Sequence, residues 1–264
     1  FRLERSIVQR RIELLQKRGV VFRLSVKIGE DPTRAELLAK FDCVYLGVGA
    51  RKARALNLPG AHLRGVSQAL PFIVQANADL PAEAPPIDVS GKRVAVIGGG
   101  DTAIDCLRTA VRCGASEAVG IYRRDEENMP CSRREYENAV EEGVRFVFQS
   151  APLAILGNDR GGVSGLQLVR TAPDGFVAGE RRPFAAQPGT EYALAADHVF
   201  LALGYVPDPH PASNPFHDLS ANEAGSLTVD AKQMTSTPGI FAGGDLVRGP
   251  TTALFAVRDA RNVA

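Results

Sequence analysis

The sequence lacks the features of a membrane protein or a nucleic-acid-binding protein. Its 31 basic and 30 acidic residues are interspersed and leave a net charge of +1, which provides no surface of one sign for a nucleic acid. No apolar run approaches the roughly 20 residues of a membrane-spanning helix, and no signal peptide is visible. The opening Phe1-Arg-Leu-Glu-Arg5 has no initiator methionine and suggests an excised fragment. We therefore expect a cytoplasmic protein that binds neither nucleic acid nor membrane.

Closely spaced metal-binding residues are also absent. The four cysteines form no Cys-x-x-Cys pair that a zinc or iron–sulfur site would need; they are Cys43, Cys106, Cys113 and Cys131. We expect buried or partly buried thiols in a reducing compartment. The four histidines are dispersed, and no Ser-His-Asp or paired-carboxylate arrangement is visible. The sequence therefore predicts no metal ligand and no catalytic side chain.

What the sequence does contain is a strand that runs through three glycines into a helix. The strand is apolar after Arg93 and leads through Gly98, Gly99 and Gly100 into a helix predicted over Asp101–Arg112. Glycines let the backbone turn sharply and approach a ligand closely, while the start of the helix offers unpaired N–H groups and the positive end of its dipole. Because a bare glycine motif is weak evidence, its context matters. The pattern predicts a seat for the pyrophosphate of a dinucleotide.

A second apolar strand, expected over 118–122, completes the βαβ unit. The residue that follows this strand meets the ribose 2′ substituent, where an acid favours a free hydroxyl and an arginine favours a 2′-phosphate. The sequence places four arginines there or shortly afterwards, and guanidinium groups can fork around one phosphate; they are Arg123, Arg124, Arg133 and Arg134. This position predicts NADPH rather than NADH.

An alternative interpretation is a solvated charged loop in which these arginines pair with the acids beside them, Asp125, Glu126 and Glu127. We favour the phosphate interpretation because the arginines stand where the chemistry requires them relative to the glycines.

The 264 residues suffice for one large domain or two medium ones. Before the glycine motif we expect a helix over 6–18, a strand over 20–24, a helix beginning at the capping box Thr33-x-x-Glu36, a strand over 43–50 and a connection over 76–90. After it we expect a helix from the capping box Ser132-x-x-Glu135 to Gly143, strands over 144–148 and 197–204, a hairpin over 152–170, an irregular segment over 207–225 and a strand over 239–242. A last helix, from about Thr251, has Ala253, Leu254, Val257 and Ala260 on its predicted inner face.

This order predicts an α/β protein in which one unit is inserted into another. The inserted unit, 90–205, is expected to be a Rossmann-like, doubly wound parallel sheet. The surrounding unit comprises 1–80 and 206–264. It has no glycine motif of its own at its front, so we expect a partial domain.

Four stretches give the chain a family resemblance. They are Val96-Ile-Gly-Gly-Gly-Asp-Thr-Ala-Ile-Asp-Cys106, Tyr122-Arg-Arg-Asp-Glu-Glu-Asn-Met-Pro130, Ser132-Arg-Arg-Glu135 and Ile240-Phe-Ala-Gly-Gly-Asp-Leu-Val-Arg-Gly249. With them the chain resembles the NADPH-oxidising small (beta) subunit of glutamate synthase over nearly its whole length. Other flavoproteins related to that subunit share its architecture and use other acceptors, such as a pyrimidine, ferredoxin or a sulfur compound.

The resemblance implies two nested dinucleotide domains, in which NADPH in 90–205 gives hydride to FAD in the other domain. Electrons then pass to iron–sulfur clusters and to a large-subunit-like partner. The iron–sulfur region and the first FAD motif of the family are not in this sequence. It also implies that the pyrophosphate lies on Gly98, Gly99, Gly100, Asp101 and Thr102, the 2′-phosphate on the four arginines, the nicotinamide near Gly204, and FAD on Gly243, Gly244, Asp245, Thr251 and Thr252.

Two alternatives remain open at this point. Residues 243–245 also fit a plain strand-to-helix turn with an aspartate cap. The chain could equally be a fragment that binds a nucleotide without turning it over.

Overall fold

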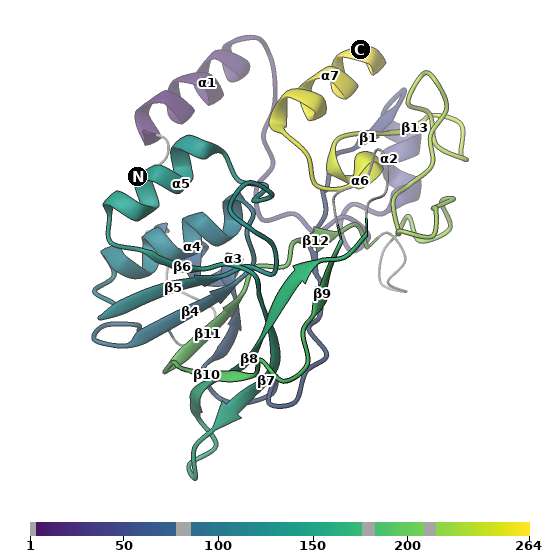
Figure 1. Cartoon of the computed structure of the whole chain (residues 1–264). Helices are drawn as coiled ribbons and strands as arrows, with labels where there is room; N and C mark the ends of the chain where they lie inside the picture. Colours follow the sequence, from purple (N-terminus) through teal and green to yellow (C-terminus); the bar gives the residue numbers. More distant parts are fainter. Residues whose placement is uncertain (1–3, 78–85, 176–182, 209–214) are drawn as a thin grey trace. The chain divides into compact units, whose positions relative to one another are not determined.

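The computed structural model describes residues 4–77, 86–175, 183–208 and 215–264 (Figure 1). They form two compact units. The inserted unit is Lys52–Tyr205, and the flanking unit consists of Phe1–Arg51 and Val206–Ala264. The short strands β2 (Lys52–Ala53) and β12 (Tyr205–Val206) pair with each other.

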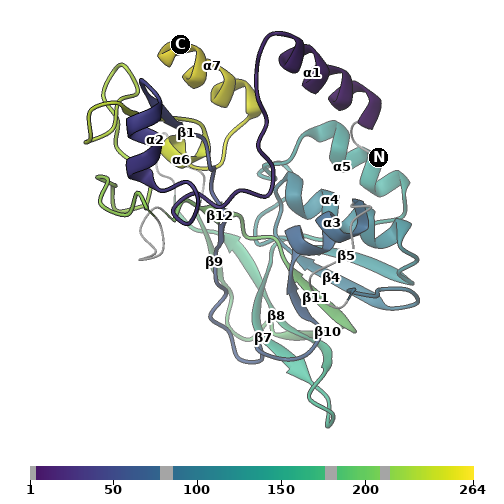
Figure 2. The ribbon, with the colours of Figure 1, turned by 180° about the vertical axis from the view of Figure 1, so that it is seen from behind.

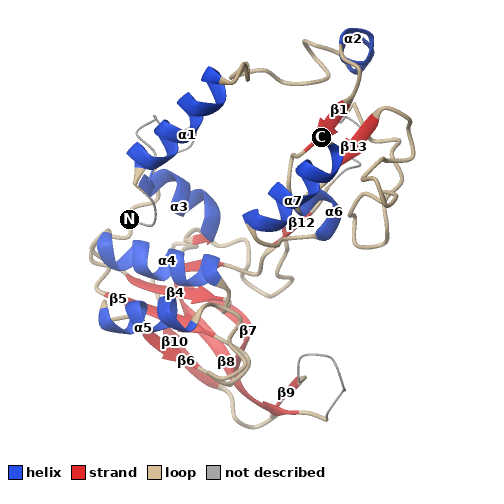
Figure 3. Ribbon diagram, turned by 90° about the horizontal axis from the view of Figure 1, so that it is seen from above, coloured by secondary structure: helices blue, strands red, loops and turns tan. Residues whose placement is uncertain are grey.

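The inserted unit is built on a five-stranded parallel sheet. Its strands have the order β3 (Val66–Gln68), β11 (His198–Leu201), β4 (Arg93–Ile97), β5 (Glu117–Ile121) and β6 (Arg145–Val147). Three helices cover one face, namely α3 (Ala69–Asn77), α4 (Asp101–Arg112) and α5 (Arg133–Glu141) (Figures 1 and 3). The expected Rossmann-like parallel sheet is confirmed.

An antiparallel sheet covers the other face of the parallel sheet (Figure 2). It contains β7 (Ser150–Gly157), β8 (Val163–Pro173), β9 (Phe184–Ala186) and β10 (Tyr192–Ala195). The central strand β4 is therefore buried on both sides. Val94 and Val96 pack with the helices, whereas Ala95 and Ile97 pack with the antiparallel sheet. Two-sided burial explains why this strand is apolar without alternation.

The boundary that we expected at residue 80 is wrong. Strand β3 pairs with β11 in the parallel sheet, and α3 packs against α4. Residues 52–77 thus belong to the inserted unit because their apolar side chains complete its core. Of the expected 76–90 connection, 78–85 lies outside the described residues, and Asn77 still belongs to α3.

Buried ion pairs join α4 to α5. Arg108, only 7% exposed, donates to Glu135 at 2.6 Å and to Glu142 at 2.7 Å. The capping box expected for α5 is modified accordingly. The Ser132 hydroxyl accepts from the Glu135 N–H at 3.2 Å, while the Glu135 carboxylate accepts from Arg108. Arg112 also donates to Glu142, and these arginines lower the pKa of Glu142 to about 2.

This network predicts acid sensitivity of the inserted unit. Because the folded pKa of Glu142 is about 2 and the unfolded value is about 4.3, the stabilisation is present above pH ~4.3 and is lost as the pH falls towards 2. Arg108→Met should lower the free energy of unfolding at pH 7 by about 2–3 kcal/mol, since Arg112 still pairs with Glu142. Its urea midpoint should change less between pH 7 and pH 3 than that of the wild type, as followed by circular dichroism.

A matched control is Arg145→Met. Arg145 pairs with Glu117 at 2.7 Å, but its side chain is 50% exposed, so we expect a change below about 1 kcal/mol. Equal midpoint shifts for the two variants would contradict the role given to burial.

The flanking unit has a small sheet and four helices among its described residues. The parallel strands β1 (Val44–Leu46) and β13 (Ile240–Ala242) are accompanied by α1 (Arg5–Lys17), α2 (Arg34–Lys40), α6 (Asp245–Arg248) and α7 (Ala253–Val263). The predicted helix 6–18 is confirmed as α1, and the Thr33-x-x-Glu36 capping box is formed. No helix among the described residues is long and apolar enough to cross a membrane.

Several expectations for the flanking unit are wrong. Residues 20–24 form no strand because no neighbouring strand in the described chain pairs with them; Val21 is 80% and Leu24 82% exposed. The strand expected over 43–50 is limited to the three residues that pair with β13. In α7 the fully buried residue is Asp259, which the pattern did not predict. Of the residues predicted to face inwards, Leu254 is 74% exposed, whereas the other three line a cavity within the flanking unit, namely Ala253, Val257 and Ala260.

The thiols also differ from expectation, since Cys43 and Cys113 are exposed. Only Cys106 is fully buried, and burial raises its pKa. Part of the expected irregular segment, 209–214, lies outside the described residues, and 215–225 contains no helix or named strand.

Candidate functional site

A cavity of about 520 Å³ opens at the carboxyl ends of β4, β5 and β11. The chain leaves β4 towards β5 on one side, while β11 lies on the other, so the cavity is at the point where the strand order reverses. Parallel α/β sheets bind their ligands at this point. Of the predicted site residues, the lining includes Gly98, Gly99, Gly100, Thr102, Arg123, Arg124 and Gly204.

The three glycines of the motif serve different purposes. A Cβ atom on Gly98 would lie 2.4 Å from the Ala202 carbonyl oxygen, and its φ is +144°. A Cβ atom on Gly99 would lie 2.5 Å from the Tyr122 ring. A Cβ atom on Gly100 would meet no protein atom within 4 Å. The first two glycines thus allow the strands to pack, whereas Gly100 keeps space open at the cavity.

The start of α4 has hydrogen-bond donors to spare. The first bond to the Gly100 carbonyl comes from the Ala103 N–H at 2.9 Å, so within the described chain the N–H groups of Asp101 and Thr102 have no backbone acceptor. Such donors favour an anion. Asp101 lies outside the cavity lining, and its carboxylate accepts from the Ser132 N–H at 3.2 Å. Its observed contact therefore joins the start of α4 to the start of α5.

The four predicted arginines are not gathered in one place. Arg123 and Arg124 line the cavity, and Arg124 donates to the Tyr122 hydroxyl at 3.4 Å. Arg133 lies outside the lining and pairs with Glu126 and with Glu137, the latter at 2.9 Å. Arg134 is exposed and outside the lining.

The charged-loop interpretation is correct for Arg133, because Glu126 accepts from it and from Tyr136. Asp125 accepts instead from Asn128 at 2.9 Å and 2.6 Å. Of the four arginines predicted to bind the 2′-phosphate, only Arg123 and Arg124 line the cavity.

Tyr122 and the start of β7 also belong to this site, although the sequence pattern did not predict them. The Tyr122 ring packs under Gly99, and its hydroxyl donates to the Asn128 carbonyl at 2.9 Å. An aromatic residue at the end of a strand and directly before two arginines was a usable signal. Ser150, Ala151 and Pro152 also line the cavity, but no local pattern could have placed them there.

Gly204 lines the same cavity beyond the end of β11. Its φ is +87°, a left-handed conformation that favours glycine, and its carbonyl accepts from the Arg54 N–H at 3.0 Å. No side chain is needed at this position to close the turn.

A second cavity, of about 540 Å³, lies within the flanking unit. The predicted residues Gly243, Gly244, Asp245, Thr251 and Thr252 all line it, along with the start of α7. Asp245 accepts from the Thr251 N–H at 2.9 Å and from its hydroxyl at 3.1 Å. The carboxylate thus fixes the loop before α7. The expected aspartate cap is not formed, because Gly244 is the N-cap of α6, Thr252 is the N-cap of α7, and neither helix start has a side-chain cap bond.

An unpredicted buried aspartate supports this second cavity. Asp259 is fully buried and accepts two bonds from Arg248, at 2.7 Å and 2.6 Å, and one from the Gly244 N–H at 3.0 Å. Arg248 lowers the pKa of Asp259. Burial and the Asp259 charge raise the pKa of Tyr45, which also lines the cavity. An acid at position 259 within an otherwise apolar helix face was the sequence signal that could have predicted this buried ion pair.

As in the first cavity, some glycines of the second cavity allow close packing and another leaves backbone open to a ligand. A Cβ atom on Gly243 would meet the Tyr45 hydroxyl and one on Gly244 the Ala256 side chain, whereas Gly49 has no protein atom within 4 Å of its Cβ position. The open backbone at Gly49 and the start of α7 suit a phosphate-bearing cofactor. No group of three His, Cys, Asp or Glu side chains among the described residues could hold a metal ion.

Curated relatives with different printed names match the whole of this chain. The glutamate synthase [NADPH] small chain of Escherichia coli (strain K12) is 40% identical over 273 residues, covering 100% of this chain and 58% of that protein. The NADPH-Fe(3+) oxidoreductase subunit beta of Geobacter sulfurreducens is 32% identical over 298 residues, covering 100% of this chain and 42% of that protein. The chain thus spans about half the length of these relatives.

The fold has a solved counterpart in Mycobacterium tuberculosis FprA in complex with NADPH. The TM-score is 0.73 at 21% identity, over 90% of this chain and 65% of that one. The family of pyridine nucleotide-disulphide oxidoreductases matches residues 5–260. With its Rossmann-like sheet and its glycine-lined cavity, this chain belongs to the pyridine nucleotide-disulphide oxidoreductase family.

Proposed function

We propose that this chain is the NADPH- and FAD-binding part of a flavoprotein oxidoreductase of the glutamate synthase small-chain type. The observation that carries the proposal is the cavity of the inserted unit, where open backbone at Gly100 and two arginines after β5 share one lining. A pyrophosphate and a 2′-phosphate need these two features at this separation along a βαβ unit.

The residues that bind NADPH follow from the lining. Gly100 and the N–H groups of Asp101 and Thr102 receive the pyrophosphate at the start of α4. Arg123 and Arg124 meet the 2′-phosphate, since arginines rather than an acid come first after Tyr122 at the end of β5, and the acids that follow them lie outside the cavity lining. Gly204 bounds the nicotinamide side. We assign no coenzyme contact to Arg133 or Arg134, which lie outside the cavity.

The flanking unit is proposed to bind FAD in its own cavity. Gly49 and the start of α7 offer backbone to the cofactor, Asp245 holds the Thr251 loop, and Thr252 presents its hydroxyl at the helix start. The hydride chemistry is supplied by the nicotinamide and the flavin when they are bound. The chain therefore needs no acid, base or nucleophile, and its residues bind, orient and exclude water.

The electrons are proposed to leave for iron–sulfur clusters or a partner subunit of the parent protein, in the cytoplasm. The two relatives are named for different reactions, glutamate synthesis and Fe(3+) reduction. A large-subunit-like partner is our first proposal for the acceptor, because the glutamate synthase relative is the more similar.

An absorption spectrum between 350 and 500 nm tests the proposal. The purified chain should show a flavin band that bleaches when NADPH is added under anaerobic conditions. If the chain binds NADPH but takes up no flavin even when FAD is added, the proposal is wrong and the chain binds a nucleotide without turning it over.

Arg124→Ala tests the 2′-phosphate assignment. We expect NADPH binding to weaken by about 1.5–3 kcal/mol, the value of a hydrogen bond to a charged group, while NADH binding changes little. Isothermal titration calorimetry with each nucleotide measures both. Arg134→Ala is the matched control, because Arg134 is exposed and outside the cavity. Equal losses for NADPH and NADH in Arg124→Ala would refute the assignment.

A further inference from the structure

The backbone of the arginine pair is held by the antiparallel sheet. Three consecutive carbonyls accept hydrogen bonds from residues near the start of β7 and in β8. Tyr122 accepts from the Ser150 N–H at 3.2 Å, Arg123 from the Thr171 hydroxyl at 2.5 Å, and Arg124 from the Gln149 N–H at 2.9 Å. The donors are at least 25 positions further along the chain, so they fix the arginine segment from outside its own βαβ unit.

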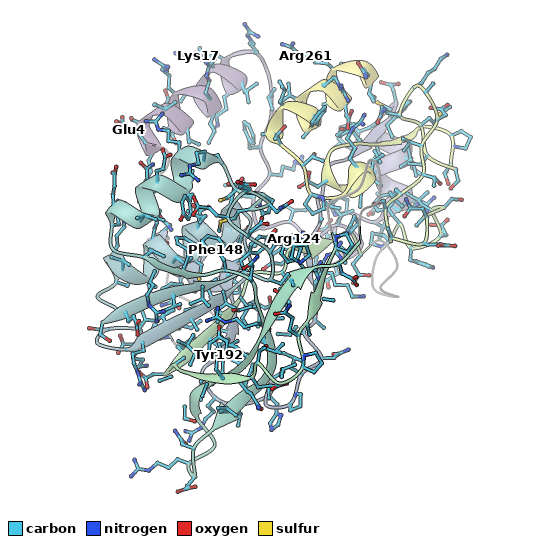
Figure 4. The ribbon with its side chains drawn as sticks, in the orientation of Figure 1. Glu4, Lys17, Arg124, Phe148, Tyr192 and Arg261 are labelled. Carbon is cyan, nitrogen blue, oxygen red and sulfur yellow. The ribbon has the colours of Figure 1, made fainter. Side chains whose placement is uncertain are left out.

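Thr171 and Gln149 are the central residues among these donors. Thr171 is 5% exposed, and its N–H donates to the Gln149 carbonyl at 2.8 Å. Gln149 has φ +49°, a left-handed conformation that costs a non-glycine residue free energy and persists only where the surroundings impose it. It lies where the chain leaves the parallel sheet at β6 and enters the antiparallel sheet at β7. The two residues therefore set the path of the backbone at Arg123 and Arg124. Arg124 is labelled in Figure 4.

We infer that Thr171 is a positioning residue for coenzyme specificity, acting through the carbonyl of Arg123. The inference rests on the proposed function, because it needs the arginine pair to bind the 2′-phosphate. Binding a phosphate through guanidinium groups demands a defined geometry. A hydroxyl that holds the backbone on which both side chains stand limits the positions those groups can reach.

The Thr171 hydroxyl can be removed without changing the volume of the side chain. Thr171→Val leaves the Arg123 carbonyl without its donor, and Thr171→Ser keeps a hydroxyl. The suitable probes are 2′,5′-ADP and 5′-AMP, which differ only in the 2′-phosphate, titrated calorimetrically into the full chain. For Thr171→Val we expect affinity for 2′,5′-ADP to fall about tenfold, the upper end for one hydrogen bond, with 5′-AMP affinity unchanged. Thr171→Ser should bind both probes like the wild type.

A double-variant cycle separates this role from a structural one. In an Arg123→Ala/Arg124→Ala background, Thr171→Val should have no further effect on 2′,5′-ADP, because the groups it positions are gone. Equal losses for both probes, no loss at all, or a loss that persists in the double-alanine background would each overturn the inference.

Failure of the proposed function would look different from failure of the inference. If Arg123→Ala and Arg124→Ala leave the preference for 2′,5′-ADP over 5′-AMP unchanged, the 2′-phosphate assignment falls and the role of Thr171 falls with it. If the arginine variants lose the preference but Thr171→Val keeps it, only the inference is wrong.

Discussion

Gly100→Ala should abolish coenzyme binding without destabilising the chain, whereas Gly98→Ala should unfold the inserted unit. At Gly98 the added methyl group would lie 2.4 Å from the Ala202 carbonyl oxygen, at φ +144°. Gly98 and Ala202 directly follow the paired strands β4 and β11, and the Ala202 N–H donates to the Ile97 carbonyl at 2.9 Å, so neither backbone can move independently. We expect a loss of about 3 kcal/mol or more from overpacking and left-handed strain together.

At Gly100 the same methyl group meets nothing. The backbone is extended there, with φ −86° and ψ 176°, which any residue adopts. Because Gly100 lines the cavity, the methyl group takes space that the pyrophosphate needs close to the start of α4. We expect NADPH affinity to fall at least about 100-fold, or about 2.7 kcal/mol.

Thermal unfolding by circular dichroism and calorimetric titration with NADPH measure the two effects. The substitutions are identical and only two residues apart, so each variant serves as the control for the other. A stable Gly98→Ala chain, or a Gly100→Ala chain that binds NADPH normally, would contradict the separate roles given to these glycines.

Asp259→Ala is expected to detach α7 and to prevent binding of the FAD proposed for the second cavity. Asp259 is the buried residue of this helix, and its carboxylate holds both Arg248 and the Gly244 N–H. Removing one partner of a buried ion pair costs about 3–5 kcal/mol. Because Arg248 keeps a side-chain exposure of 32%, we expect a value near the lower end.

Hydrogen exchange of residues 253–263 and the flavin content of the purified chain measure this effect. Arg261→Ala is the control on the same helix, since Arg261 is exposed (Figure 4). Asp259→Asn keeps an acceptor for the Gly244 N–H while removing the charge that pairs with Arg248, and it should have an intermediate effect. Normal exchange protection in Asp259→Ala would show that other contacts hold α7.

Local patterns predicted the elements whose start, end and apolar face are encoded within a few residues. The helix Asp101–Arg112 and the parallel strands beside it have the predicted type, and α4 has the predicted bounds. The Thr33-x-x-Glu36 box forms as expected. Local patterns could not decide whether residues 20–24 form a strand, because a strand exists only when a partner strand pairs with it.

The amino-acid sequence by itself determined the glycine turn, the helix after it and the placing of arginines at the end of the next strand, because these depend on neighbours along the chain. Only the tertiary structure decided which arginines reach the cavity. Glu126 and Glu137 hold Arg133 outside the lining, while Thr171 and Gln149 hold the backbone of Arg123 and Arg124 at it. These partners come from distant parts of the chain as well as from nearby helix turns, and packing of the two sheets brings the distant ones together. The same reason applies to Asp259, whose burial was set by Arg248 and Gly244 rather than by the apolar pattern of its own helix.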